Sequence, residues 1–235
     1  MRVWAELGPQ GAGQGAARGD VVVVVDALRA SVTIAAALRA GARRVIPVQT
    51  VEEAHAYLAD PDCRVAGERG GARLPRFHYG NSPTEIWAQR AEVAGRTLVL
   101  TTSNGTRCVH AALGGAAAVL VGSTVNAGAV SARAFARAGQ RGCDVTLVAA
   151  GLGGGPADED RFAQGVLAGR LVRLGAVLAE SVAEVCEADS QEVFARSGAA
   201  ARLTELGYGE DVLFCSQIDV WDTVPIYRQD GFYSL

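Results

Sequence analysis

The sequence predicts an α/β fold in which helices cover both faces of a mostly parallel β-sheet. Two observations lead to this prediction. The first is the run Val21–Val25, which is too short and too β-branched for a helix and too uniformly apolar for a half-exposed strand. A strand buried on both faces is typical of a parallel sheet. The second is the recurrence of similar short runs, separated by stretches rich in Ala and Arg whose apolar residues have helical spacing.

The expected strands follow one another along most of the chain. A first strand precedes the valine run, and the Gly-rich segment Gly8–Gly19 between them is expected to be a flexible surface loop. The later strands are expected at Arg44–Val48, Arg64–Ala66, Thr97–Leu100, Val119–Val121 and Val145–Ala149. Because helical spacing separates these strands, we expect βαβ units and therefore parallel neighbours.

One helix has a clear start. Ser82 is its expected N-cap, Pro83 occupies the first helical position, and Glu85 stands three residues after the cap, which is the pattern of a capping box.

The pattern changes after about residue 175. Helical segments are expected at Val177–Glu187, Gln191–Ser197 and Ala200–Leu206, and an extended tail at Val224–Tyr227. We interpret residues 1–235 as a single α/β domain, with 176–235 as a C-terminal extension packed on the sheet.

Composition excludes several classes of protein. The chain is 49% hydrophobic and 20% charged, which excludes disorder. The net charge is −3 and neither sign forms a long block, so we expect no nucleic-acid or membrane partner. All 22 basic residues are Arg, which excludes any mechanism that needs a Lys, such as a Walker A loop or a pyridoxal-phosphate Schiff base.

The remaining metal-binding and redox residues are sparse. The three His residues lack paired spacing, which argues against a zinc site of several histidines. The five Cys residues are scattered and are expected to be buried thiols in a reducing compartment. Since the N-terminus lacks the apolar core of a signal peptide and no run reaches 18 apolar residues, we expect a cytoplasmic protein.

Polar segments follow four of the expected strands at the point where each strand ends. These segments are Asp26–Ser31, Gly67–Gly71, Thr101–Thr106 and Gly151–Gly155. In open α/β sheets, ligands bind outside the carboxyl ends of the strands. The sequence therefore predicts a binding site for an anionic small molecule at this edge of the sheet.

Each segment also has a purely structural interpretation. Asp26 could cap the next helix, Gly67–Gly71 could be an exposed turn with a surface ion pair, and Thr101–Thr106 could be capped by its own hydroxyls. Arg29 favours the functional interpretation of the first segment, because it places an anion-binding group beside a carboxylate. Asn104-Gly105 before a helix leaves free N–H groups that suit an anion.

Acidic residues also open the helix after the last of these segments. Asp158-Glu159-Asp160 could favour the helix dipole or could hold a divalent cation. The set of oxygen ligands Asp26, Glu68, Glu159 and Asp160 would suit Mg²⁺ rather than Zn²⁺.

Other site signatures fail. Gly151–Gly155 does not match the dinucleotide pattern GxGxxG. Cys63 and Arg69 have the spacing of cysteine phosphatases, but the residues between them are expected to form a strand. Leu28 stands where a haloacid dehalogenase-type phosphatase needs its second Asp, and His110 is expected to pack.

Several motifs occur in order from about residue 20 to the C-terminal region. They are Val24–Ile34, Gly67–Gly71 with Phe77, Gly80–Glu85, Thr101–Thr106, Gly122 with Asn126, Gly151 leading to Glu159-Asp160, and the region Asp211–Pro225. Together they resemble the 2-phosphosulfolactate phosphatase family, the Mg²⁺-dependent enzymes of coenzyme M biosynthesis.

The resemblance implies hydrolysis of a phosphate monoester on a small hydroxy acid that carries a sulfonate, with Mg²⁺ as cofactor. The expected catalytic residues are Asp26, Arg29, Glu68 and Arg69, and the expected metal ligands are Asp26, Glu68, Glu159 and Asp160. The expected substrate-binding residues are Ser31, Asn81, Ser82, Thr101, Thr102, Asn104, Gly105, Asn126 and Gly153. The cationic and N–H donors among them suit a substrate with several anionic groups.

Alternatives remain open at this stage. Water could attack phosphorus directly, or a hydroxyl such as that of Ser31 or Thr101 could form a covalent intermediate. The substrate could instead be phosphoglycolate or phospholactate, or the glycine segment could bind a dinucleotide or an anionic metabolite without turnover. The oligomeric state is also open, a homo-oligomer included.

Overall fold

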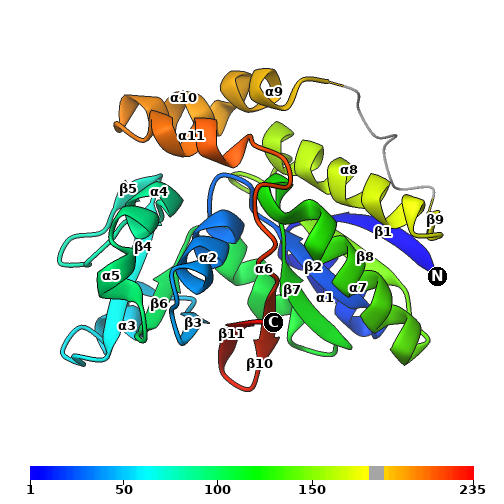
Figure 1. Ribbon diagram of the computed structural model, residues 1–235, viewed down its shortest axis with the longest axis horizontal. Coiled ribbons are helices and arrows are strands. Elements are labelled where there is room, and N and C mark those ends of the chain that lie inside the picture. Colours follow the sequence, from blue (N-terminus) through cyan, green and yellow to red (C-terminus); the bar gives the residue numbers. More distant parts are fainter. Residues whose placement is uncertain (180–187) are drawn as a thin grey trace.

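A computed structural model describes residues 1–179 and 188–235, which form one 11-stranded sheet with helices on both faces (Figure 1). The strands are β1 (Arg2–Leu7), β2 (Val21–Val25), β3 (Arg44–Pro47), β4 (Cys63–Arg69), β5 (Ala72–Arg73), β6 (Thr97–Thr101), β7 (Ala118–Val121), β8 (Val145–Ala149), β9 (Val177–Leu178), β10 (Pro225–Arg228) and β11 (Gly231–Ser234). Their order across the sheet is β5-β4-β6-β3-β11-β10-β7-β2-β8-β1-β9.

The helices connect and cover these strands. They are α1 (Gly8–Ala17), α2 (Ala30–Arg39), α3 (Val51–His55), α4 (Pro83–Ala88), α5 (Arg90–Val93), α6 (Gly105–Ala112), the 3₁₀ turn η1 (Thr124–Asn126), α7 (Ala127–Arg141), α8 (Asp158–Arg173), α9 (Ser190–Arg196), α10 (Gly198–Glu205) and α11 (Gly209–Cys215). Helices α9 to α11 lie above the sheet at the top of Figure 1.

The predicted α/β class and the buried valine strand are confirmed. Strand β2 pairs in parallel with β7 and β8, and its side chains are buried on both faces. Val21, Val23 and Val25 pack in a core with α7 and α8, whereas Val22 and Val24 pack in a second core with α1, α2 and α6. This alternation follows from the two-residue period of a strand. Because both faces are apolar, polar side chains are concentrated beyond the strand ends.

The extended tail predicted near the C-terminus becomes part of the sheet itself. The hairpin β10–β11 lies between β7 and β3 and is antiparallel to both. Glycine is needed at position 231, because an added Cβ would lie 2.8 Å from the carbonyl oxygen of Val45. The hairpin therefore joins the two mostly parallel parts of the sheet.

The prediction of a flexible loop at Gly8–Gly19 is wrong, because most of this segment is helix α1. Its glycines permit a close approach to the sheet. A Cβ at Gly11 would lie 2.6 Å from Cβ of Glu6, and a Cβ at Gly15 would lie 2.9 Å from the side chain of Thr146. Pro9 in the first turn and the buried Ala12 support the helix.

Two smaller predictions also need correction. Ser82 caps α4 by accepting from the N–H of Glu85, but the reciprocal bond of a capping box is replaced, since the Glu85 carboxylate accepts from Gly80 N–H instead. The helix expected over Val177–Glu187 is wrong at its start, where Val177–Leu178 forms the edge strand β9. The rest of that segment, 180–187 with Cys186, lies outside the described residues. Helix α11 was not predicted.

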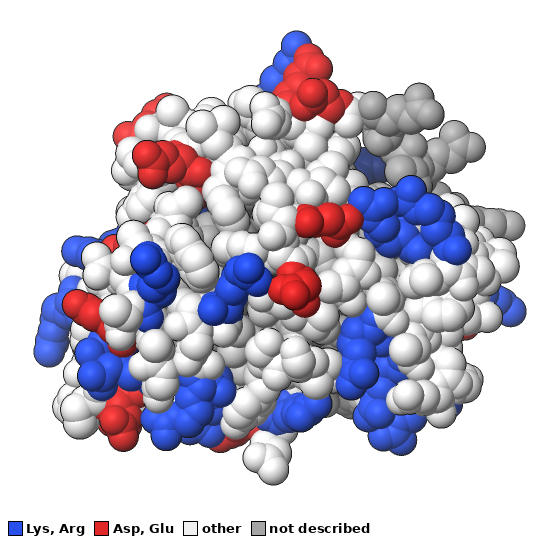
Figure 2. Space-filling view, viewed as in Figure 1, with Lys and Arg blue, Asp and Glu red and all other residues white. Residues whose placement is uncertain are grey.

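The expectation of buried thiols is confirmed for Cys63, Cys108 and Cys215, whereas Cys143 is half-buried. No helix within the described residues is long and apolar enough to cross a membrane. The described cysteines at 63, 108, 143 and 215 are all free thiols. Figure 2 shows acidic and basic side chains interspersed over the face in view, in keeping with the absence of charge blocks in the sequence.

Candidate active site

A cavity of about 240 Å³ lies where the predicted polar segments meet. The segments after β2, β4, β6 and β8 all contribute to it, as the rule for open α/β sheets predicts. Helix α10, above the sheet in Figure 1, supplies four more lining residues, and Asn81 comes from the segment before α4. The lining residues are Asp26, Leu28, Arg29, Glu68, Gly70, Gly71, Asn81, Ser103, Asn104, Leu152, Gly198, Ala199, Arg202 and Leu203.

Asp26, directly after the valine strand, is a buried carboxylate that lines this cavity. Only 7% of the residue is exposed, and its Oδ1 accepts the N–H of Ala30 at 3.0 Å. Burial raises the pKa of Asp26 to about 6, and the negative charges of Glu68 and Glu159 add to the shift. Only glycine fits at position 105, because an added Cβ would lie 2.6 Å from Oδ2 of Asp26.

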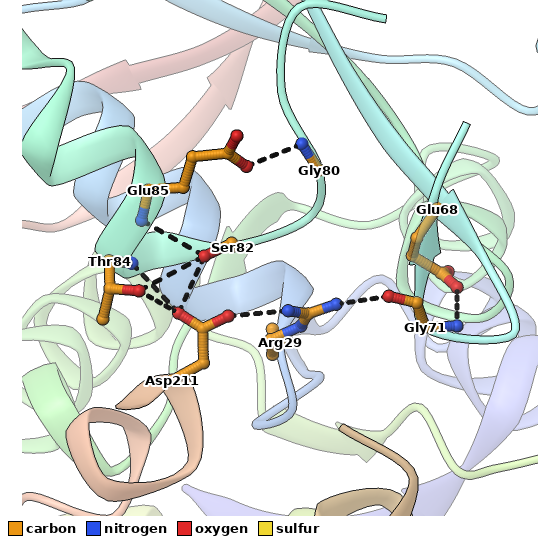
Figure 3. Close-up of polar contacts among 8 residues, drawn as sticks. All are labelled: Arg29, Glu68, Gly71, Gly80, Ser82, Thr84, Glu85 and Asp211. Carbon is orange, nitrogen blue, oxygen red and sulfur yellow. Dashed lines mark hydrogen bonds and ion pairs between the residues drawn. The ribbon is translucent and has the colours of Figure 1, made fainter. Parts of the chain in front are cut away.

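Glu68, at the end of β4, is fixed by two backbone N–H groups. Its Oε1 accepts from Ser103 N–H at 2.7 Å. Its Oε2 accepts from Gly71 N–H at 2.7 Å, a bond that Figure 3 shows. Gly71 takes a left-handed φ of +84°, which favours glycine. The carboxylate is therefore held in one orientation at the cavity wall.

Arg29 is a buried guanidinium that joins distant parts of the chain. It is 2% exposed, and its Nη1 lies 2.6 Å from Oδ2 of Asp211 while its Nη2 donates to the carbonyl of Gly71 at 2.8 Å (Figure 3). Its guanidinium also stacks on Tyr208, 4.3 Å from the ring centroid. The positive charge is thus balanced by a buried partner.

Asp211 is a buried acidic residue that the sequence alone does not predict to belong to the site. Its Oδ1 accepts from the hydroxyls of Ser82 and Thr84 and from the N–H of Thr84 (Figure 3). In the sequence it is one of two acidic residues in the first turn of a short helix, a place where acids commonly only favour the dipole. The sequence feature that could have indicated Asp211 is its position at the start of Asp211–Pro225, the last of the regions that resemble the phosphatase family.

Asp160 and Glu159 are buried and do not line the cavity. The oxygens of Asp160 accept from Ala27 N–H at 2.7 Å and from Gly151 N–H at 2.8 Å, so this side chain braces the ends of β2 and β8. Burial, followed by the charges of Asp26 and Glu159, raises the pKa of Asp160 well above its ordinary value. Burial also raises the pKa of Glu159.

The negative charges of Asp26 and Glu68 would attract a cation, but these two side chains alone do not form a full set of metal ligands. No three His, Cys, Asp or Glu side chains gather as a metal site within 1–179 and 188–235. Asp26 and Glu68 nevertheless line one cavity, and no Arg among the described residues forms an ion pair with either. Buried negative charge without a partner is costly, and oxygen ligands of this kind suit Mg²⁺.

The other predicted residues line the cavity, support its wall, or serve the scaffold. Asn81 and Asn104 line the cavity, and Asn104 precedes α6 without capping it through its side chain. Arg69 donates to the Glu68 carbonyl and to the hydroxyl of Thr101, so both of these residues support the wall of the site.

The remaining four residues serve the scaffold or a turn. Ser31 accepts from Asp26 N–H and donates to a strand carbonyl, and Thr102 bonds to the first turn of α6. Asn126 accepts from Ser123 N–H and donates to the carbonyl of Thr223. Gly153, with φ of +59°, lies in the tight turn that Leu152 and Gly155 close.

Comparisons with known proteins show which family the sequence matches. A sequence profile of a family described as 2-phosphosulpholactate phosphatase matches residues 9–230. The chain is 40% identical over 234 residues to a probable 2-phosphosulfolactate phosphatase of Thermus thermophilus, covering 97% of this chain and 95% of the relative. It is 36% identical to a probable 2-phosphosulfolactate phosphatase of Deinococcus radiodurans, covering 88% and 87%. It is 38% identical to the 2-phosphosulfolactate phosphatase of Methanothermobacter thermautotrophicus, covering 95% and 90%.

Proposed function

Since the chain belongs to the 2-phosphosulfolactate phosphatase family, we propose that it hydrolyses the phosphate monoester of 2-phosphosulfolactate to sulfolactate and inorganic phosphate. The observation that carries the proposal is the pair Asp26 and Glu68 in one cavity with Arg29 and Arg202. The volume of about 240 Å³ suits a small phosphorylated acid. Such a reaction belongs to coenzyme M biosynthesis, as the sequence resemblance implies.

The proposal includes Mg²⁺, which Asp26 and Glu68 would hold. When bound, Mg²⁺ neutralises charge on a phosphoryl group and lowers the pKa of a coordinated water. The chain itself prepares for this charge by fixing Glu68 with two N–H groups and by burying Asp26 beside other carboxylates. Asp160 acts as a positioning residue, because it holds the strand ends that carry the site.

The anionic substrate would meet several donors from this chain. The N-terminus of α6 begins at Gly105, next to the cavity-lining Asn104, and the dipole of this helix favours an anion there. Arg202 adds a cation from α10. These groups bind and orient the phosphoryl group, which reduces the entropy that the reaction must lose.

Direct attack by water is the route that the geometry favours. The hydroxyl of Ser31 is buried and bonded to the backbone, and the hydroxyl of Thr101 accepts from Arg69. Neither side chain lines the cavity. A covalent intermediate on either hydroxyl would therefore require the site to rearrange.

Phosphate release tests the proposal. Racemic 2-phosphosulfolactate, phosphoglycolate and phospholactate are each incubated with the protein in Mg²⁺ and in EDTA. We expect Mg²⁺-dependent release with the highest kcat/KM for the sulfonate substrate. A preference for phosphoglycolate or phospholactate would make that ester the assigned substrate in place of 2-phosphosulfolactate. Phosphate release that persists in EDTA would remove Mg²⁺ from the proposal. Failure to release phosphate from all three would reject the phosphatase assignment.

A further inference from the structure

A second cavity lies at the ends of β1 and β8, outside the candidate active site. Its volume is about 450 Å³, against about 240 Å³ for the cavity of Asp26 and Glu68. Its lining comes from the end of β1, from α1, from the start of α6 and from the segment after β8. None of the charged residues that line the active-site cavity lines the second one, and among the described residues only Asn104 lines both. The chemistry of the second cavity must therefore be considered separately.

This cavity lies at a point where the connections of two neighbouring strands diverge. Strands β1 and β8 are parallel and hydrogen-bonded to each other. Helix α1 follows β1 and packs on the same face of the sheet as α6, whereas α8 follows β8 and packs with α7 on the opposite face. In open α/β sheets, ligands bind in the crevice that such a divergence leaves at the carboxyl ends of the strands. The crevice between β1 and β8 is therefore a binding position that the candidate active site does not use.

The charges of the lining favour an anion. Arg107, an exposed residue in the first turn of α6, lines the crevice, and none of the ion pairs within residues 1–179 and 188–235 involves it. Glu6 is the acidic residue of the lining, and its carboxylate lies 3.2 Å from the guanidinium of Arg18. The negative charge of Glu6 is thus balanced, whereas the positive charge of Arg107 is not. A cleft with an excess of one charge attracts ligands of the opposite charge.

The uncharged part of the lining suits the carbon skeleton of an organic ligand. Leu7, Pro9 and Ala150 offer apolar contacts, and the carboxamide of Gln14 can donate or accept hydrogen bonds. Small-molecule sites typically have volumes of about 300–1,000 Å³ and combine an apolar lining with a few polar groups. The crevice, at about 450 Å³, falls within this range. Volume, charge and apolar contacts together indicate a small organic anion.

We propose that the crevice between β1 and β8 is a second ligand site, which binds a small organic anion through the guanidinium of Arg107. The ligand carries a phosphate-type or carboxylate group on a short carbon chain, and the chain contacts Leu7 and Pro9. This site is distinct from the cavity of Asp26 and Glu68, whose unpaired carboxylates attract a cation instead. The inference does not depend on the proposed phosphatase function.

Calorimetry in EDTA tests the site without turnover. The main probe is propylphosphonate, which a phosphatase cannot hydrolyse. Arg107→Ala should weaken its binding by at least about tenfold, because the variant lacks one charge-assisted hydrogen bond. Gln14→Glu should also weaken binding, because it adds a negative charge to the lining with little change of shape. Wild-type affinity in both variants would overturn the proposal, and so would the absence of measurable binding to the wild type.

Two further arginine variants serve as matched controls. Arg173→Ala removes an exposed guanidinium at the end of α8 that lines neither cavity, and Arg202→Ala removes a cation from the active-site cavity. Both should bind propylphosphonate with wild-type affinity, since in EDTA the carboxylates of Asp26 and Glu68 disfavour an anion in the other cavity. A loss in Arg202→Ala with full affinity in Arg107→Ala would place the probe in the active-site cavity. Equal losses in Arg173→Ala and Arg107→Ala would reduce the effect to overall charge. Either result would overturn the proposal.

Two other probes identify the class of the anion. Butyrate carries a carboxylate on a carbon chain of similar length, and inorganic phosphate has no carbon chain. Tighter binding of propylphosphonate than of butyrate assigns a phosphate-type ligand, and the reverse order assigns a carboxylate. Inorganic phosphate should bind more weakly than propylphosphonate, because it makes no apolar contact with the crevice. Equal affinity for these two probes would reject an organic ligand. Thermal unfolding of each variant checks that the fold is kept.

Discussion

Asp26 is a buried carboxylate whose charged form is unfavourable at this position. Its carboxylate is buried beside Glu68 and Glu159, and the N–H of Ala30 only partly offsets that burial. Such an arrangement is unfavourable for folding alone, because the charged form loses water and faces like charges. It becomes useful when a cation occupies the cavity. The residue thus exchanges stability for binding, which is common at functional sites.

The raised pKa of Asp26 predicts that the stability of the protein in EDTA depends on pH. The pKa of Asp26 is about 6 in the folded protein, above its ordinary value of 3.8, so the folded state binds the proton more tightly. The contribution of this group to stability is therefore present below pH 3.8 and is lost as pH rises to about 6. The unfolding temperature of the wild type, measured relative to that of Asp26→Asn, should therefore fall as the pH rises from 4 to 7. A constant difference over that range would contradict the raised pKa.

Only part of the site could be predicted from single residues. Asp26 and Glu68 directly follow apolar runs, so the rule for strand ends places them correctly. Ser31 and Asn126 belong to the same kinds of motif, but their side chains bond to the scaffold. A sequence does not show which way a side chain points. Asp211 was missed because the buried ion pair that defines its role joins residues far apart in the chain.

Among the elements, helix α1 shows where composition misleads. A segment with many glycines resembles a linker, yet here two glycines allow the helix to lie against the sheet. The opposite outcome at Val21–Val25 has a simple cause, since five apolar β-branched residues fit only a buried strand. Glycine is informative only when its neighbours in space are known.

The glycines of α1 give a matched pair of variants. Gly11→Ala should destabilise the protein by about 1–3 kcal/mol, because its Cβ would clash with Glu6. Gly13→Ala should stabilise it by about 0.5–1 kcal/mol, because no atom lies within 4 Å and alanine favours a helix. Urea unfolding of both variants measures the difference. Equal effects of the two substitutions would mean that α1 does not pack as described.

For the whole molecule, the C-terminal part completes both the sheet and the site. The hairpin β10–β11 fills the centre of the sheet, α10 brings Arg202 to the cavity, and α11 brings Asp211 to Arg29. The extended character of the tail was predictable from its residues. Its partners were not, because pairing with β3 and β7 depends on contacts between segments more than 100 residues apart.

Asp211 is the residue through which this assembly can be tested. Asp211→Ala leaves the buried charge of Arg29 unpaired and removes three bonds to Ser82 and Thr84, so it should destabilise the fold by about 3–5 kcal/mol. Phosphatase activity should fall as well, since Arg29 loses its orientation. Thermal unfolding measures the first effect and kcat/KM at a temperature where the variant is folded measures the second. A variant as stable as wild type would show that the pair does not join the two parts.

The most direct measurement of the central claim is kcat/KM for Mg²⁺-dependent phosphate release from 2-phosphosulfolactate by carboxylate variants. The account predicts that Asp26→Asn and Glu68→Gln each lower kcat/KM by at least about a hundredfold. Arg39→Ala, which removes an exposed ion pair with Asp222 outside the cavity, should keep the wild-type value. Full activity in both carboxylate variants would contradict the assignment of this cavity as the phosphatase site.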